Sequence, residues 1–110
     1  MEKNQLLIKS ESGKPNTFKG IEFLVLAHGE NSMITKMLYK DNQKVPLHKH
    51  INEQSGYVIS GTYLLKFLDY EEIINAGDSY TIPANVEHSL QVKTPGVVID
   101  FFTPVREDYL

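Results

Sequence analysis

The chain has 110 residues, enough for one domain with one core, and its 41% hydrophobic and 23% charged residues are typical of a folded globular protein. A formal net charge of −3 provides no basic footprint for nucleic acid or an anionic membrane surface, so neither is expected as a partner. Cysteine is absent, which excludes disulfide bonds and thiolate metal ligands and fits a cytoplasmic location. We expect a single domain over residues 1–110, with no signal-peptide core and no membrane-spanning stretch.

Short β-type runs separated by turn residues follow one another along the chain. The first expected strand is 21–27, and a second, 33–39, follows the turn cluster Gly-Glu-Asn-Ser. Further expected strands are 56–60, 62–68, 70–74, 79–82, 88–92 and 97–102. The two runs that flank Gly61 are expected to form a hairpin, and the only helix signal, a weak one, lies at 106–110.

The spacing of these runs indicates the fold class. They recur about every 8–12 residues, as in an all-β sandwich or barrel. Prolines stand at the run boundaries, where a missing N–H harms a strand ladder least. We predict an antiparallel β-barrel or double-sheet jelly roll, whose interior either fills with side chains or encloses one small ligand.

The segment His48-Lys49-His50 is the strongest chemical signal in the sequence. Residues two apart on a strand point to the same face, so both imidazoles converge and Lys49 faces away. Gln54 reaches the same point if the chain turns back as a hairpin, and His88 can reach it from a neighbouring strand. Three imidazoles with an open position suit a catalytic divalent metal, although a pair of histidines at this spacing is by itself a weak signal.

The residues around these histidines resemble the two sequence motifs of the cupin family. In the first motif, 46–61, the matching residues are His48, His50, Gln54 and Gly61. In the second, 77–88, they are Gly77, Pro83 and His88. Asn85 stands where glycine is usual, and asparagine also tolerates a left-handed backbone. The resemblance implies a double-stranded β-helix, one metal ion in the barrel mouth and frequent homodimers. His28 fits neither motif and is expected at a turn or at the rim.

Gln54 departs from the family, which more often has glutamate at this ligand position. Period two places Gln54 on the face of the histidines unless a bulge shifts the register, in which case Glu53 is the fourth ligand. The other alternative is that Gln54 orients a histidine without binding metal. A shell of three histidines and one amide leaves the metal's double charge unbalanced, which favours Lewis-acid work over oxygen activation at iron. Zn, Ni, Mn, Fe and Co suit such a shell about equally well.

Two polar residues near the C-terminus stand out. Asp100 interrupts the apolar run 97–102, where a carboxylate is costly unless it is paired or hydrated. If its face looks into the barrel, Asp100 can act as a general acid or base; otherwise it faces solvent or a dimer partner. Arg106 is the only arginine, and its planar fork suits a substrate carboxylate. A structural bridge from Arg106 to Asp100 or Glu107 is an equal alternative.

The tail 100–110 resembles the ending of small cupins of pectin and uronate degradation, which ketonise the unsaturated uronate released by pectate and alginate lyases. By that resemblance Asp100, Phe102 and Arg106 are the catalytic pocket residues. We expect a metal-dependent isomerase or tautomerase that acts on a small carboxylated sugar. It is expected to be a homodimer, with the segment 6–9 crossing between subunits. An iron-dependent dioxygenase and a non-catalytic sugar-binding cupin are the alternatives.

Overall fold

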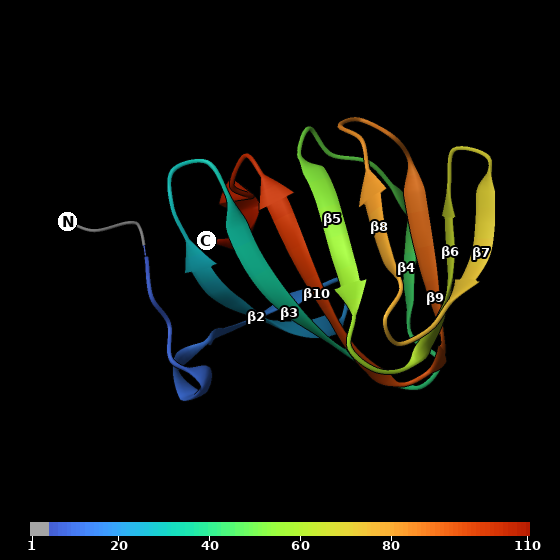
Figure 1. Ribbon diagram of the computed structural model, residues 1–110, viewed down its shortest axis with the longest axis horizontal. Helices are drawn as coiled ribbons and strands as arrows, with labels where there is room; N and C mark the ends of the chain where they lie inside the picture. The colour runs from blue at the N-terminus through green and yellow to red at the C-terminus, as the bar shows by residue number, and fades with distance from the viewer. Residues whose placement is uncertain (1–4) are drawn as a thin grey trace.

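The computed structural model describes residues 5–110, which form ten strands and two short 3-10 helices. In chain order these are η1 (Ser10–Ser12), β1 (Lys14–Phe18), β2 (Ile21–His28), β3 (Met33–Tyr39), β4 (Lys44–His48), β5 (Glu53–Val58), β6 (Thr62–Phe67), β7 (Tyr70–Ile74), β8 (Ser79–Ile82), β9 (His88–Thr94), β10 (Gly96–Thr103) and η2 (Glu107–Tyr109). A six-stranded sheet has the order β1-β2-β3-β10-β5-β8, and a four-stranded sheet has the order β4-β9-β6-β7. Figure 1 shows the larger sheet at the left and centre of the view and the smaller one at the right.

Alternation of inward and outward residues explains why these segments are strands with one buried face. In β3 the buried residues are Met33, Thr35, Met37 and Tyr39, with partly exposed residues between them. In β10 they are Val98, Asp100 and Phe102. The inward faces of both sheets share one core, whose members that are 1% exposed or less include Phe23, Val58, Tyr63, Ile82 and Val98.

The path of the chain is that of a double-stranded β-helix. From β4 onward, consecutive strands alternate between the two sheets, apart from β6 and β7, which form an antiparallel hairpin. All pairings between neighbouring strands are antiparallel. The predicted all-β jelly-roll barrel is therefore confirmed.

Gly61 does not close a hairpin, contrary to expectation, because β5 and β6 belong to different sheets. Its φ is 92°, and a Cβ there would lie 2.5 Å from Oη of Tyr63 and 2.9 Å from the carbonyl oxygen of Pro95. Glycine is thus required where the chain crosses between sheets. A turn residue in the sequence predicts that the chain reverses direction, but it does not predict which sheet the next strand joins.

The two ends of the described chain contain little regular secondary structure, and the crossing of segment 6–9 to a second subunit stays a prediction from the sequence. Segment 6–9 forms no strand; only Gln5 pairs, through an isolated bridge with His28, and Leu6 and Leu7 are exposed. The helix signal at 106–110 corresponds to the single 3-10 turn η2. Within residues 5–110 no helix is long and apolar enough to cross a membrane.

Candidate metal centre and pocket

Three histidines from separate segments meet between the two sheets. One ring nitrogen from each of His48, His50 and His88 lies within 4.8 Å of the others. His48 ends β4, His88 begins β9, and the two residues are direct cross-strand partners. The backbone N–H of Asn85 donates a 2.8 Å hydrogen bond to the carbonyl of His50, which ties the loop before His88 to the first motif. Asn85 has a φ of 63°, the left-handed conformation in which asparagine can replace glycine.

His50 reaches the cluster by a different route from the one expected. β4 ends at His48, so His50 does not share a strand face with it. The chain leaves the strand and bends, which brings the two ring centroids to 5.6 Å. The ring centroids of His48 and His88 are 4.2 Å apart. The two histidines do meet, as their spacing predicts, but a bend after β4 brings them together and not a shared strand face.

A backbone carbonyl two residues away orients each ring in the same manner. The Nδ1 atoms lie 2.9 Å from the carbonyl oxygens of Pro46 for His48, of Asn52 for His50 and of Val86 for His88. An Nδ1–H that donates to a carbonyl leaves Nε2 with the lone pair that a metal requires. The three rings therefore have matching tautomers available for one ion.

The donor set fits a divalent metal. Nε2 of His88 is buried and has no hydrogen-bond partner among the described residues, an arrangement that costs about 1–3 kcal/mol when nothing binds the atom. Burial lowers the pKa of His48 and of His50, and it lowers that of His88 to about 4. All three imidazoles are then neutral at pH 7, the state that ligates metals.

Gln54 adds an oxygen to this cluster. Its Oε1 lies 3.1 Å from Nε2 of His50. It approaches from β5, in the opposite sheet from β4, and not through the hairpin that we expected. Glu53, the alternative ligand, is exposed, whereas Gln54 is half-buried. Because Nε2 is the atom of His50 that would bind a metal, this position suits Gln54 as a fourth ligand beside His50 and disfavours Glu53.

Asp100 and Phe102 lie on the inward face of β10, each 2% exposed. Oδ1 of Asp100 accepts a 2.7 Å hydrogen bond from the hydroxyl of Tyr80. Burial raises the pKa of Asp100 to about 6, although hydrogen bonds from Tyr80 and Gln54 act in the opposite direction. A carboxyl group with a pKa near neutrality can both donate and accept a proton. The ring of Phe102 stands edge-on to that of His50, with centroids 5.8 Å apart, and forms an apolar wall beside the cluster.

Arg106 is enclosed by aromatic rings and is 6% exposed. Its guanidinium carbon lies 4.1 Å from the ring centroid of Tyr109, 5.3 Å from that of Phe102 and 5.4 Å from that of Phe18. Nη1 also donates a 3.0 Å hydrogen bond to the hydroxyl of Tyr109. Cation–π contacts of this kind are strongest away from water, so the rings hold the guanidinium inside the barrel.

The carboxylate bound to Arg106 is that of Asp108. Nη2 and Nε donate to its two oxygens at 2.6 and 3.2 Å. The bridge to Asp100 or Glu107 that we considered is therefore wrong in its partner, because the turn η2 brings Asp108 back toward Arg106.

A small cavity connects these groups. Its water-accessible volume is about 30 Å³, room for about two water molecules. The polar and aromatic residues that line it are His48, His88, Gln54, Tyr80, Asp100, Phe102, Arg106 and Tyr109, together with Phe18 and Tyr39.

Asn52 is a positioning element that the sequence analysis overlooked. Its carbonyl orients His50, and its Nδ2 donates to the carbonyls of Pro104 and Val105, at 2.7 and 3.4 Å. One buried asparagine thus fastens the tail that carries Arg106 to the histidine cluster. His28 lies outside the cluster: it is buried at the end of β2, where its backbone pairs with Gln5, and not at an exposed rim.

Comparison with known proteins agrees with this geometry. The family model described as "Cupin domain" matches residues 35–102, more than half of the chain. The pectin degradation protein KdgF of Dickeya dadantii (strain 3937) is 27% identical over 93 residues, which make up 83% of this chain and 84% of that protein. The crystal structure of an RmlC-like cupin from Shewanella frigidimarina NCIMB 400 matches over all of both chains, with a TM-score of 0.91 and 25% identity. KdgF from Halomonas sp. has a TM-score of 0.86 and 23% identity over 94% of this chain and 99% of its own.

Proposed function

The chain belongs to the cupin domain family, and from that premise we propose that it is a metal-dependent isomerase that ketonises a small unsaturated uronate. One observation carries the proposal: a single cavity is lined by two imidazoles of the histidine cluster, His48 and His88, by the carboxyl group of Asp100 and by Arg106. The similarity to a pectin degradation protein supports a uronate as the substrate class. A cytoplasmic location stays a prediction from the sequence.

The histidine cluster supports binding of one divalent ion, Zn, Ni, Mn, Fe or Co, by His48, His50 and His88 with Gln54 as the fourth ligand. When bound, such an ion supplies Lewis-acid stabilisation of negative charge on a substrate oxygen. The neutral amide of Gln54 leaves that charge undiminished.

Asp100 is the proposed proton carrier. Ketonisation of an enol removes a proton from its oxygen and adds one to a carbon, so the atoms balance without an oxidant. A carboxyl group with a pKa of about 6 performs both transfers near neutral pH. Burial of Asp100 beside Phe102 keeps bulk water from competing for that proton.

Arg106 is the proposed site for the substrate carboxylate. Its fork already binds a carboxylate through two hydrogen bonds, which supports recognition of this group. Asp108 has to yield that place, and its side chain is 59% exposed and free to turn outward.

The test is conversion of an unsaturated uronate prepared with a lyase and followed by NMR in D₂O. Metal-loaded protein is expected to accelerate ketone formation above the spontaneous rate, with deuterium entering at one carbon. Asp100→Asn should retain metal and lose the acceleration, whereas Lys49→Ala, an exposed neighbour of the histidines, should retain both. No acceleration by fully loaded protein would refute the isomerase. Oxygen uptake would then indicate a dioxygenase, and binding without conversion a sugar-binding cupin.

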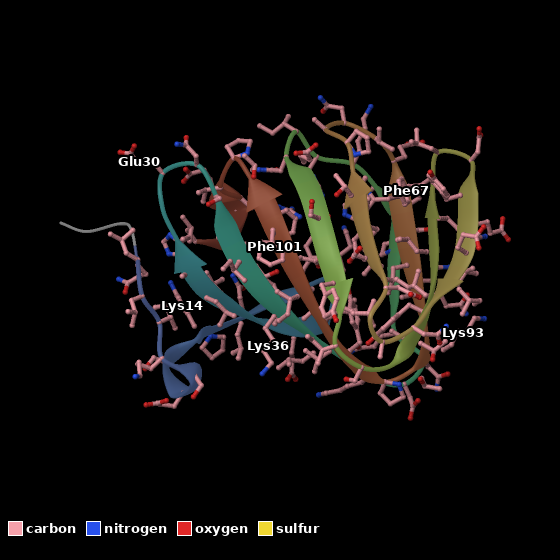
Figure 2. All side chains as sticks on the ribbon, in the orientation of Figure 1. Lys14, Glu30, Lys36, Phe67, Lys93 and Phe101 are labelled. Carbon is pink, nitrogen blue, oxygen red and sulfur yellow. The ribbon has the colours of Figure 1, made fainter. Side chains whose placement is uncertain are left out.

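A homodimer belongs to the same proposal. Tyr57 and Phe101 stand on the outer face of the six-stranded sheet, 46% and 42% exposed, and Figure 2 shows Phe101 on the side toward the viewer. Exposed aromatic residues on a sheet face are typical of a surface that a second subunit covers. Sedimentation at several concentrations tests this, and a monomer at all of them would rule it out.

A further inference from the structure

Tyr80 is a polar group that lines the cavity; it lies within the second motif, 77–88, but is not one of the residues that match the family. Its hydroxyl donates a 2.7 Å hydrogen bond to Oδ1 of Asp100. The two residues lie on different strands, β8 and β10, and β5 runs between these strands in the six-stranded sheet. The contact therefore spans a whole strand.

The register of the three strands explains how the contact forms. Asp100 is paired with Gly56, and Gly56 is paired with Tyr80, so the three residues form one row across the sheet. Directly paired residues present their side chains on the same face. Two strand spacings, roughly 10 Å, separate the backbones of Asp100 and Tyr80. A long side chain that lies flat over the middle strand can bridge that gap.

Gly56 provides the room for this bridge. A Cβ on Gly56 would lie 2.6 Å from Cε1 of Tyr80 and would overlap Cζ and the hydroxyl oxygen still more. Gly56 is not among the glycines with positive φ, so its backbone conformation does not demand glycine. The position needs glycine because the tyrosine ring lies across it.

We propose that Tyr80 is a positioning residue for Asp100: its hydrogen bond fixes Oδ1 and, with it, the orientation in which the carboxyl group exchanges a proton with the substrate. The proton exchange rests on the proposed function; the fixed orientation of Asp100 does not. Burial and the neighbouring carboxylate raise the pKa of Tyr80 well above its usual range, so the phenol stays protonated and remains a donor. A buried carboxyl group loses this hydrogen bond when it rotates, so the bond favours one orientation.

The test compares Tyr80→Phe with wild type, both loaded with metal. Phenylalanine keeps the ring and removes only the donor, so the barrel and the metal content should be unchanged. We expect kcat to fall by about 10-fold or more and KM to stay within about 2-fold, because positioning acts on proton transfer and not on binding. The matched control is Tyr63→Phe, which removes another buried hydroxyl, the 2.8 Å donor to the carbonyl of Ser60, and should leave kcat unchanged.

A crystal structure of Tyr80→Phe supplies a readout that requires no substrate. We expect the carboxylate of Asp100 to rotate or to occupy two orientations. Gly56→Ala, which displaces the ring, should lower kcat by a similar factor, and Tyr80→Phe should add nothing in the double variant. An unchanged kcat together with an unmoved Asp100 would overturn the proposal. If wild type lacks ketonising activity but Asp100 still reorients in Tyr80→Phe, the proposed function fails and the positioning role stands.

Discussion

Arg106 holds both carboxylate oxygens of Asp108, at 2.6 and 3.2 Å, although the side chain of Arg106 is 7% exposed and that of Asp108 is 59% exposed. The anchored partner is thus the cation, and the mobile partner is the carboxylate. A buried cation is costly to leave without a partner, whereas an exposed carboxylate can return to water once another carboxylate takes its place. A second carboxylate can therefore replace Asp108 at little cost.

Removal of Asp108 should improve substrate binding. In Asp108→Ala the substrate carboxylate no longer competes for Arg106, so we expect KM to fall by up to about 5-fold with kcat unchanged. Steady-state kinetics on the unsaturated uronate measure this, and Glu107→Gln, an exposed neighbour that does not contact Arg106, is the control. A KM that rises several-fold would mean that Asp108 orients Arg106 instead of competing with the substrate.

Replacement of the guanidinium group of Arg106 should weaken substrate binding. Arg106→Lys keeps the charge but loses the two parallel donors, so we expect KM to rise by at least about 10-fold while kcat changes little. The comparison should include an uncharged analogue of the substrate. If the variant affects the charged and uncharged substrates equally, Arg106 is not the carboxylate site.

The metal should depend on the histidines and stabilise the fold. Elemental analysis of protein purified without added metal should give about one ion per chain in wild type and in Lys49→Ala, and essentially none in His50→Ala. Chelation should lower the Tm of wild type and leave that of His50→Ala unchanged, because an ion that binds only the folded chain stabilises it by mass action. Equal metal content in all three proteins would place the ion elsewhere.

Asp100 should make the free energy of unfolding of the metal-free protein depend on pH. Its pKa is raised from 3.8 to about 6, so between about pH 4 and pH 6 the folded chain keeps a proton that the unfolded chain has lost. The contribution of Asp100 to the free energy of unfolding therefore falls as pH rises through this window and stays low above it. Asp100→Asn avoids this loss, and its stability relative to wild type should increase by roughly 3 kcal/mol from pH 4 to pH 7.

Denaturant unfolding of both proteins at each pH provides that comparison. The histidines, whose lowered pKa values make stability rise with pH over a similar range, are common to the two proteins and cancel in the difference. A pH-independent difference would mean that Asp100 is hydrated in solution.

Much of the fold and part of the site could be predicted from the sequence. The barrel was predictable because the strands alternate and because turn residues recur at short intervals. Asp100 could be singled out because one carboxylate in an apolar run is an anomaly whatever its neighbours are. The structure brings it together with His48 and His88 in one cavity.

Other features depend on register, which a single sequence does not encode visibly. Tyr80 lies in the expected strand 79–82, but nothing in that segment indicates that Gly56 lies opposite it. β1 was missed because it is an edge strand, mostly exposed and without clear alternation. The pairing of Arg106 with Asp108 depends on a single turn of 3-10 helix, which is too short to produce a periodic pattern in the sequence.

The position of β10 makes folding of the barrel depend on the last strand. β10 is the last strand of the described chain, yet it lies in the middle of the six-stranded sheet, between β3 and β5. A shortened chain that lacks it has two incomplete half-sheets with open edges, which are prone to aggregate. Closure of the barrel therefore waits for the strand pairing that is most distant in sequence, that of β3 with β10, and such a topology folds in milliseconds to seconds and not in microseconds. Asp100 lies on that strand, so an incompletely folded molecule lacks this carboxyl group in its pocket.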